Sequence, residues 1–380
     1  MSKKVNLKSK NESVNDEINY TIKSDKLFIN YGYIKNEDKY INGLYDYFYQ
    51  TEQCLLKSYS TIYFYFKNTE YINKYFDLLF LLSEKYNKID ILNLKQFNFT
   101  NETIIKLCDF LKLNKLEILE LNLFEISNEN LELLAETLRN NLSVKKLVLD
   151  YGRLNNYHYH ILTEQLKYNK NINELIIEFS TYSYNDKYLY YISELLKYNH
   201  NIHNLIIKHT FEDEELTCLS EILKSSSIQY LKLYNCEITD EQFDVFYNSL
   251  KNNKTLIKLD LSWNNLTNKS YLKILEFLKD NKTLINLNLN GDKNKDIILF
   301  TEKLKEVMKF NNTLQVLKIG GDFFQKRVNH MNSINSLSEM LKSNKTINKL
   351  KLSQHIFNNK KYENILLDVI NNKPNFKFYF

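Results

Sequence analysis

The chain has few cysteines, glycines and prolines. Its 380 residues include four cysteines, six glycines and one proline. The cysteines at positions 54, 108, 218 and 236 are scattered without paired spacing, so we expect neither a disulfide framework nor a zinc site.

Long apolar runs and a strong charge of one sign are also missing. No apolar run approaches the roughly 20 residues that span a bilayer, and residues 1–24 lack the apolar core of a signal peptide. The 51 basic and 46 acidic residues give a net charge of +5, which predicts no strong nucleic-acid or membrane field. We therefore expect an intracellular, cytoplasmic protein with no membrane partner.

Motifs for chemistry are sparse. The sequence has no Gly-x-x-x-x-Gly-Lys-Ser/Thr loop, which excludes that nucleotide-binding module. His158-Tyr-His160 and His200-Asn-Ile-His203 could hold a metal, but neither has a nearby cysteine or a second spaced pair, so ordinary surface histidines are favoured. We predict no catalytic residue, no metal, no cofactor and no small-molecule substrate.

Two glycine-containing segments fall at equivalent strand ends, Gly291-Asp292 and Gly320-Gly321-Asp322. A backbone nest for phosphate is one interpretation. Tight turns that need glycine's permissive φ angles are the favoured one.

One phrase recurs along the chain: an aliphatic residue, two variable positions, Leu, one variable position, then Leu or Ile. Its successive starts lie 26 to 33 residues apart, at Ile89, Leu116, Val144, Ile172, Ile202, Ile228, Leu256, Leu284, Leu314 and Ile347. A period near 28 indicates a stacked repeat, in which no single unit can bury its apolar face alone.

The seventh repeat shows the pattern within a unit. Leu259 and Leu261 are two apart, as in a strand with one buried face, and Leu272, Leu275 and Leu278 follow at a helical spacing. Each unit is therefore predicted to be a strand, a turn and an antiparallel helix. In the sixth repeat, Thr239 and Gln242 fit a capping box at the helix start.

The ends of the predicted helices carry an asparagine in a fixed register. It stands three residues before the next phrase, at Asn141, Asn169, Asn199, Asn253, Asn281, Asn311, Asn344 and, before the terminal strand, Asn372. Because Asn tolerates the left-handed conformation, we expect it to end the helices where Gly usually does.

A second ladder of charges lies on the helices. Glu precedes Lys or Arg by three residues in seven repeats, at 136/139, 164/167, 194/197, 221/224, 276/279, 306/309 and 339/342. We interpret these pairs as a solvated convex face; a functional charged stripe is the alternative.

These residues resemble the leucine-rich repeat family, specifically its ribonuclease-inhibitor-like class of about 28-residue units. The resemblance covers residues 89–374 and implies an α/β solenoid, a horseshoe with a parallel sheet on the concave face and helices on the convex face. It says little about function, because this class binds many unrelated partners. The family's Asn or Cys after the strand is present at Asn264 and Cys236, whereas Gly152, Asp292 and Asp322 occupy that position elsewhere.

The predicted organisation has four parts. Residues 1–24 form a disordered polar N-terminus, 25–88 an N-terminal cap with degenerate repeats, 89–374 ten leucine-rich repeats, and 375–380 a terminal strand. Within the cap we predict a strand at 26–30, an aromatic helix at 40–59 and a repeat-like strand at 61–66.

A binding surface is predicted on the concave side, where the third, fifth and seventh phrase positions point. Val148, Ile176 and Ile206 occupy the fifth position of three successive repeats and predict one aliphatic row. Aromatic or imidazole rings around it are Tyr151, Phe179, His209, Tyr230, Tyr234 and Trp263. Such a cluster resembles an interface hot spot; the alternative is that β-branched residues simply suit strands.

Charge on the same side is polarised. Acidic residues gather in repeats 2–4, at Glu120, Asp150, Glu174 and Glu178, against Lys146. Basic ones gather later, at Lys232, Lys258, Lys318, Lys349, Lys351 and Lys377, against Asp260. This pattern either orients a partner or serves only solubility.

Two further features stand near the C-terminus. The 33-residue ninth repeat has surplus residues at 322–331, which predict a projecting loop whose Phe323 or Phe324 contacts a partner or the concave rim. Phe378 and Phe380 occupy core positions of the terminal strand with no following helix. We expect a monomer, with self-association through this end as the alternative.

Together these patterns predict a non-catalytic scaffold that binds a protein partner on its concave surface. The alternative is a regulator of enzymatic activity, such as a GTPase activator or a ubiquitin-ligase substrate adaptor. Nucleic-acid binding through the later lysines is less favoured.

Overall fold

The computed structural model describes most of the chain from residue 99 onward and short stretches before it. The described residues are 3–5, 20–23, 26–30, 61–65, 76–77, 79–80, 83, 89–94, 99–123, 126–150, 155–178, 187–211, 213–224, 227–291, 296–320, 330–373 and 376–379. The predicted helix at 40–59 and most of the predicted loop at 322–331 lie outside these residues.

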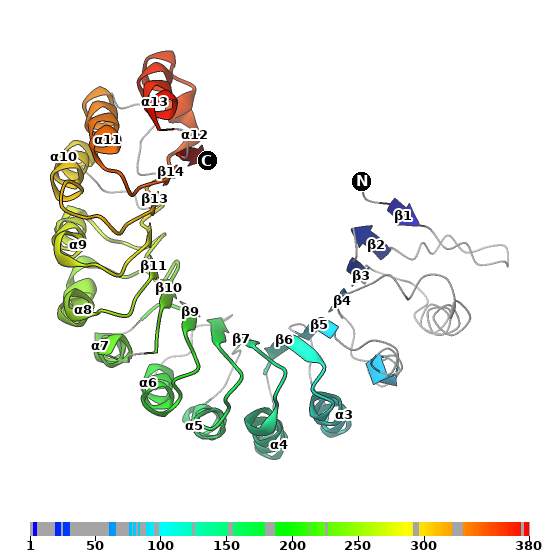
Figure 1. The fold of residues 1–380 in the computed structure, drawn as a ribbon. Coiled ribbons are helices and arrows are strands. Elements are labelled where there is room, and N and C mark those ends of the chain that lie inside the picture. The colour runs from blue at the N-terminus through cyan, green and yellow to red at the C-terminus, as the bar shows by residue number, and fades with distance from the viewer. Residues whose placement is uncertain are drawn as a thin grey trace. The chain divides into compact units, whose positions relative to one another are not determined.

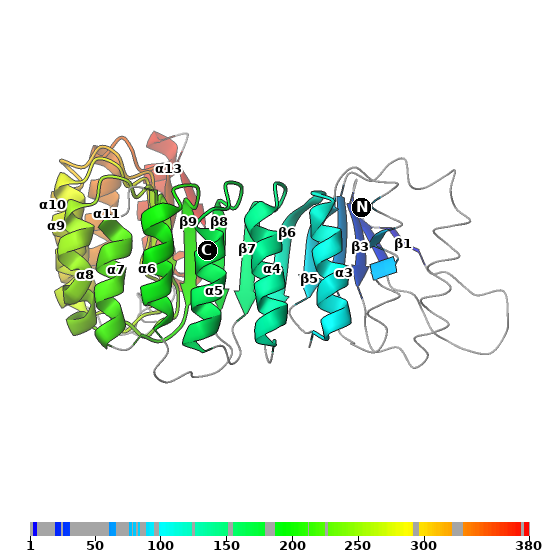
Figure 2. The same ribbon diagram turned by 90° about the horizontal axis from the view of Figure 1, so that it is seen from below.

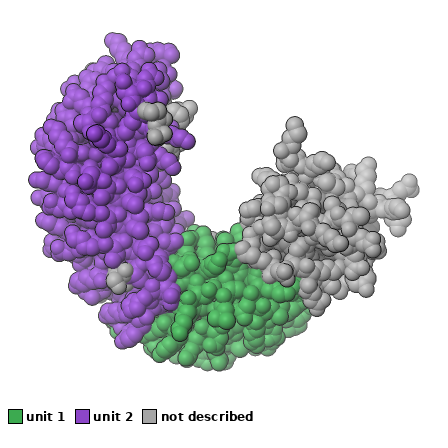
Figure 3. All heavy atoms as spheres, in the orientation of Figure 1, with its two compact units in different colours: residues 1–191 green, residues 192–380 purple. Residues whose placement is uncertain are grey.

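The chain divides into two compact units, residues 1–191 and residues 192–380 (Figure 3). Each unit contains its own run of paired strands, with helices on one side of the strands. The boundary falls within helix α6 (Tyr188–Tyr198).

In the first unit, β1, β2 and β3 pair antiparallel, and from β3 to β8 each strand is parallel to the next. The strands are β1 (Lys3–Val5), β2 (Tyr20–Lys23), β3 (Lys26–Asn30), β4 (Thr61–Tyr65), β5 (Ile89–Leu94), β6 (Leu116–Asn122), β7 (Lys146–Asp150) and β8 (Glu174–Glu178). The helices α3 (Asn101–Lys112), α4 (Asn128–Asn140) and α5 (Asn156–Leu166) run alongside them (Figure 2).

In the second unit, every strand from β9 to β15 is parallel to the next. The strands are β9 (Asn204–Lys208), β10 (Tyr230–Leu233), β11 (Lys258–Asp260), β12 (Asn286–Asn288), β13 (Val316–Lys318), β14 (Lys349–Lys351) and β15 (Lys377–Tyr379). The helices are η2 (Asp213–Glu215), α7 (Leu216–Lys224), α8 (Asp240–Asn252), α9 (Asn268–Asp280), α10 (Ile297–Val307), α11 (Met331–Ser343), α12 (Gln354–Phe357) and α13 (Lys360–Asn372). Figure 1 shows α7 to α11 on one side of the strand row. The predicted α/β leucine-rich-repeat solenoid is confirmed.

The core of each repeat lies between strand and helix. In the seventh repeat Leu259 and Leu261 are buried, as predicted, and so are Leu275 and Leu278 of α9. Leu272 is exposed instead, because the buried stripe runs through Tyr271, Ile274, Leu275 and Leu278 at the i, i+3, i+4, i+7 spacing. The predicted capping box of α8 is confirmed: Thr239 and Gln242 bond each other's backbone N–H groups.

The N-terminal segment contains more strand than we expected. β3 and β4 match the predicted strands, but β1 and β2 lie within residues 1–24, which the sequence predicted to be disordered. Polar composition misled this prediction, since β2 carries the alternation Tyr-Thr-Ile-Lys and pairs antiparallel with β3 across a two-residue connection.

The asparagine at each helix exit is held by its side chain rather than by its backbone conformation. At Asn311, which is 1% exposed, Oδ1 accepts hydrogen bonds from the N–H groups of Thr313 and Leu314 at 3.1 and 2.9 Å. Its Nδ2 donates to the carbonyls of Leu278 and Asn281 in the preceding repeat at 2.7 and 3.2 Å. At Asn141, Asn169, Asn253, Asn281 and Asn344, Oδ1 accepts in the same way and Nδ2 donates to one or two carbonyls of the preceding repeat.

The expected left-handed backbone is therefore wrong for these residues. Asn141, Asn253, Asn281 and Asn344 have φ between −80° and −69° and ψ between 129° and 133°, which is extended. Asn is required because it presents an acceptor and a donor at once, and Gly can do neither. A left-handed exit does occur at Asn114, with φ of 53°, which lies outside the predicted register.

Lysine replaces asparagine at both ends of this ladder. The predicted Asn372 is exposed and bonds Asp368. Lys373 takes its place: its Nζ donates to the carbonyls of Leu341 and Asn344, and burial lowers the pKa of its ammonium group. Before the first asparagine, Lys115 Nζ donates to the carbonyl of Ser83 in the same way.

Only part of the predicted charge ladder pairs within its own helix. The Glu–Lys pairs at 164/167, 194/197 and 221/224 form i,i+3 salt bridges. Other members reach neighbouring helices: Glu339 pairs with Lys305, and Lys342 with Asp368. These contacts join successive helices.

At the C-terminal end the aromatic packing differs from the prediction. The final helix is confirmed as α13, and Phe378 pairs in register with Leu350. The fully buried ring is Phe376, whereas Phe378 is partly exposed and packs edge-to-face on Phe357 and Phe376. Phe380 lies outside the described residues.

Candidate interaction surface

Alternation along each strand separates a core face from a face that the described helices leave uncovered, which we term the open face. In β8, Leu175 and Ile177 are buried on the helix side, so Glu174, Ile176 and Glu178 project from the open face. The same third, fifth and seventh phrase positions form the open face in every repeat.

The open face of the first unit holds the predicted aliphatic pair. Val148 and Ile176 are directly paired in the β7–β8 register, but they are only 2% and 9% exposed. The third predicted member, Ile206, belongs to β9 in the second unit and is partly exposed. The pair thus offers little accessible apolar area of its own.

Two carboxylates on this part of the open face are held by polar side chains of neighbouring strands. Lys146 Nζ lies 2.8 Å from Glu174 Oε1 across the β7–β8 pair. Asn93 Nδ2 donates to Glu120 Oε2 at 2.6 Å. Both interactions tie neighbouring strands together, which gives these side chains a structural role.

In the second unit, two predicted tyrosines are covered by lysines. Tyr230 and Tyr234 are partly exposed on β10 and at its end. Lys258 Nζ lies 5.8 Å from the Tyr230 ring centroid, and Lys232 Nζ lies 5.0 Å from that of Tyr234. Both distances fit cation–π contacts, so these rings and lysines form one mixed aromatic and basic surface.

Trp263 stands in an unusual backbone conformation at the rim next to this surface. It is the eighth residue of its repeat and has φ of 60°, while the equivalent Asn235 and Gly291 have φ of 54° and 100°. Asn and Gly adopt this left-handed conformation readily, whereas a bulky residue there is strained. The Trp263 ring is 41% exposed and packs so closely on Gly291 that a Cβ there would lie 2.5 Å from it.

His209 and Cys236, which lie nearby in adjoining repeats, are not reactive groups. Burial lowers the pKa of His209 to about 4, and its ring packs edge-to-face on Phe211. Burial raises the pKa of the Cys236 thiol to about 12. The Cys236 backbone N–H donates to Asn264 Oδ1 at 3.1 Å. The two residues that match the family's Asn or Cys after the strand therefore bond each other across neighbouring repeats.

The lysines on the open face of β13, β14 and β15 differ from Lys146, which pairs with Glu174. Among the described residues of this unit, the salt bridges involve helix side chains and none reaches Lys318, Lys349, Lys351 or Lys377. The acid on the open face, Asp260, is 8% exposed and accepts hydrogen bonds from Ser262 and Asn288.

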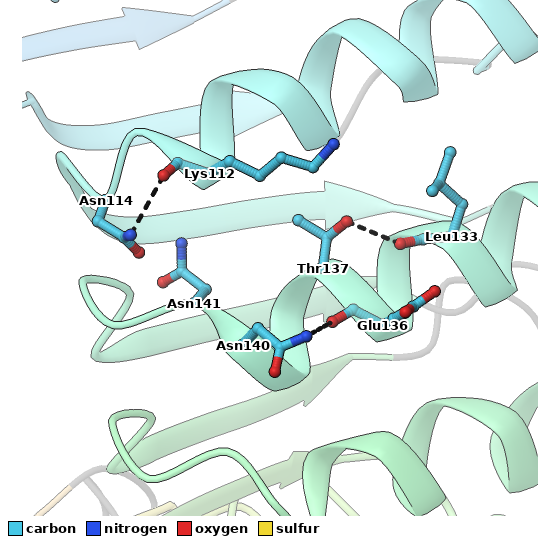
Figure 4. A pocket seen from close by; sticks show the side chains of 7 residues that line it. All are labelled: Lys112, Asn114, Leu133, Glu136, Thr137, Asn140 and Asn141. Atoms are coloured by element: carbon cyan, nitrogen blue, oxygen red, sulfur yellow. Dashed lines mark hydrogen bonds between the residues drawn. The ribbon is translucent and has the colours of Figure 1, made fainter.

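Two pockets lie among the helices of the first unit. One of about 290 Å³ lies where α3 and α4 end (Figure 4). The side-chain donors of Asn114, Thr137 and Asn140 bond backbone carbonyls of Lys112, Leu133 and Glu136. A second pocket, lined by Glu136, Arg139 and His160 among others, opens between α4 and α5. Neither brings together a nucleophile and a base.

Two of the four candidate metal-binding histidines, His158 and His160, lie on α5. His158 Nδ1 accepts a hydrogen bond from the Asn155 N–H as part of a capping box, and burial lowers the pKa of its imidazole. His160 packs against Tyr191. No group of three or more His, Cys, Asp or Glu side chains suited to a metal occurs within the described parts of the chain.

The two glycine segments at strand ends also have a structural explanation where they are described. Gly291 has φ of 100°, as a tight turn requires. Gly320 is needed for space, because a Cβ there would lie 2.7 Å from Asn290 Oδ1 and 3.1 Å from the Leu352 carbonyl carbon. The remaining residues of both segments are outside the description.

Four predicted site residues, Tyr151, Phe179, Phe323 and Phe324, also lie outside the described residues, and their role stays a prediction. Of the others, the structure brings Tyr230, Tyr234 and their lysines together. The sequence pattern placed the lysines of β13–β15 on the concave side as part of a charge polarity but not among the partner-binding residues, and the strand register sets them beside one another. Among the described residues, no helix is long and apolar enough to cross a membrane.

Comparisons with known proteins find distant structural likenesses. No family model matches the chain, and no curated protein matches it significantly. Among solved structures, a chain described as leiomodin-1 actin-binding site 2 matches with a TM-score of 0.36 and 20% identity, over 41% of this chain and 87% of that one. The tropomodulin C-terminal domain of Caenorhabditis elegans matches with a TM-score of 0.28 and 11% identity, over 44% and 84%. Likenesses at this level carry no argument about a partner.

Proposed function

We propose that the chain is a non-catalytic scaffold that binds a protein partner on its open face. The observation that carries the proposal is the surface around Tyr230, Tyr234 and Trp263. These are large, partly exposed rings in the second unit, and one of them is held in a strained backbone. Aromatic side chains of this kind anchor protein interfaces, and local strain persists where function maintains it.

The construction of the repeats supports this proposal. A strand, turn and helix of about 28 residues favour the ribonuclease-inhibitor-like class, in which the sheet side is the binding side. The predicted division into an N-terminal cap, ten repeats and a terminal strand belongs to the same proposal, as do a cytoplasmic location and a monomeric state. No cofactor, metal or small-molecule substrate is required.

The direct test compares partner capture by matched variants. Tyr234→Asp places a charge in the aromatic surface, and Leu272→Asp places the same charge on the exposed helix side of α9. We expect the wild type and Leu272→Asp to capture the same protein from native cells, identified by mass spectrometry, and Tyr234→Asp to lose it.

The captured protein should then bind the purified chain in calorimetry, with an affinity at least tenfold weaker for Tyr234→Asp. Circular dichroism confirms that both variants fold. Equal capture by both variants would show that the partner binds elsewhere.

The alternative function, regulation of an enzyme, would use the same face. If the captured protein is a GTPase or a ubiquitin-ligase component, its activity measured with and without the chain distinguishes regulation from simple scaffolding.

A further inference from the structure

The open face of β13, β14 and β15 carries four lysines, Lys318, Lys349, Lys351 and Lys377, which we call the lysine cluster. Lys349 is in register with Lys377, and Lys318 with Lys351. Neighbouring strands lie about 4.8 Å apart and alternate residues of one strand about 6.8 Å apart. The four side chains therefore stem from a small grid.

All four project from the open face because the residues between them are core. Leu317 and Leu350 are both 0% exposed and pack toward the helices. Lys349 and Lys377 are exposed, and Lys318 and Lys351 are partly exposed.

The cluster has a cost for the fold. Like charges directly opposite each other on a sheet are destabilising, and no salt bridge among the described residues offsets them. On the adjoining strand β12, the open-face residues Asn286 and Asn288 are neutral. Asp260, two strands away from β13, already accepts hydrogen bonds from Ser262 and Asn288.

Protection of an open sheet edge does not explain this arrangement. Lysine on the last strand discourages edge pairing, which accounts for Lys377 on β15. Lys318 and Lys349 lie on strands that are paired on both sides, so they have no such role.

We propose that the lysine cluster docks an acidic segment of a protein partner. The segment would present at least two carboxylates about 5–7 Å apart, as Glu or Asp at alternate positions of an extended chain do. The proposal rests on the proposed function, since it names the chemistry of the partner that the open face binds.

A protein segment fits better than a nucleic acid. Single-stranded nucleic acids are held by a basic groove combined with aromatic rings on which bases stack. The open-face positions of β12 to β14 hold Asn286, Asn288, Val316, Lys318, Lys349 and Lys351, with no aromatic residue. On β15 the strand position in register with Lys351 is Tyr379, so these strands carry a single aromatic residue where stacking of successive bases calls for several.

The test uses the purified full chain and a fluorescein-labelled peptide of about ten residues with alternating Glu and Ser. Fluorescence anisotropy measures its affinity, with the Gln-Ser peptide and an oligothymidine of similar length as comparison probes. We expect the Glu-Ser peptide to bind, the Gln-Ser peptide to bind at least tenfold more weakly, and affinity to fall as salt rises.

Two double variants with the same change of net charge distinguish binding by the lysine cluster from attraction by the net charge of the chain. Lys349→Glu with Lys351→Glu should weaken Glu-Ser binding at least tenfold. Lys254→Glu with Lys345→Glu alters exposed lysines at helix exits and should change it less than twofold. Circular dichroism and melting curves verify that both are folded.

Equal affinities for the two double variants, or no binding of the Glu-Ser peptide to the wild type, would overturn the proposal. Tighter binding of the oligothymidine with the same lysine dependence would replace the acidic segment by a nucleic acid. Because no native partner enters this assay, its failure leaves the capture test on Tyr234 unaffected.

Discussion

The helix exits and the open face belong to the same repeats, but the residue type repeats from unit to unit at the exits and varies on the open face. At the exits, Asn recurs in one register, and its side chains from Asn141 to Asn344 are buried and accept hydrogen bonds from the N–H groups two and three residues later, as at Asn281 and Asn311. On the open face, the fifth position holds Ile206, Lys232 and Asp260 in three successive repeats.

The difference follows from what surrounds each position. A buried N–H or carbonyl without a partner costs about 1–3 kcal/mol, so the buried exit positions favour a side chain that satisfies both at once. An exposed strand position has no such demand, and its residue is open to selection by a partner. Substitutions at the exits should therefore change stability, and those on the open face should change binding.

The largest effect is expected at an exit. Asn311→Ala removes the partner of two N–H groups and two carbonyls, so we expect it to lower the free energy of unfolding by about 3 kcal/mol. Urea denaturation measures this. Asn312→Ala, at the exposed neighbour, is the control and should cost less than about 0.5 kcal/mol. Similar losses for both would mean that the ladder does not stabilise the repeats.

A smaller effect is expected at His209, which directly follows strand β9. The pKa of His209 is about 4 in the folded chain, below its ordinary 6.5, because burial disfavours the charged ring. As pH falls from 6.5 toward 4, the unfolded chain takes up a proton that the folded chain does not, so stability is lost over that window.

We expect His209 to contribute about 1–2 kcal/mol of this loss between pH 7 and pH 5. Denaturation curves for the wild type and His209→Gln at both pH values isolate that share from the other histidines. The same pH dependence in both proteins would show that His209 titrates normally.

At Trp263 we expect the Gly variant to be more stable than the Ala variant, which reverses the usual order of stability. Because a φ of 60° strains Ala but not Gly, Trp263→Gly should be more stable than Trp263→Ala by about 1 kcal/mol. At Leu272, in a helix, the Ala variant should be the more stable by about 1 kcal/mol. If Ala is favoured at both sites, Trp263 is unstrained and its conformation gives no reason to assign it a function.

The smallest effect is a gain. Lys349→Gln removes one of two like charges that face each other across β14 and β15, so stability should rise by about 0.3 kcal/mol in low salt. The gain should disappear in high salt, where the repulsion is screened. Lys345→Gln, at an exposed exit position, should show no gain. A loss of stability at Lys349 would mean that the lysine helps to hold the fold.

Much of the fold could be predicted because it depends on spacing. The phrase starts located the strands from β5 onward, and the Thr239–Gln242 pair located the start of α8. The function of the exit asparagine could not be derived, since its register was visible but its bonds reach carbonyls about 30 residues earlier. Lys373 was missed for the same reason, because an ammonium group can replace an amide only when the geometry of the previous repeat is known.

The candidate surface was harder to predict. Alternation placed Val148 and Ile176 on the open face correctly, but it could not show that side chains around them leave 2% and 9% of their surface exposed. Strain at Trp263 depends on a backbone angle, although Asn and Gly at the equivalent positions 235 and 291 were a readable signal. The predicted residues at 151, 179, 323 and 324 stay predictions.

The fixed bonding of the exit asparagine limits where a repeat can grow. Each asparagine stands three residues before its phrase, as Asn253 does before Leu256 and Asn344 before Ile347, whereas the stretch from a phrase to the next asparagine varies from 25 residues after Leu256 to 30 after Leu314. The differences in length among these repeats therefore fall in the stretch from the phrase to the next asparagine. An epitope or a fluorescent reporter grafted there would leave the ladder in register, while a single residue added between Asn253 and Leu256 would break it.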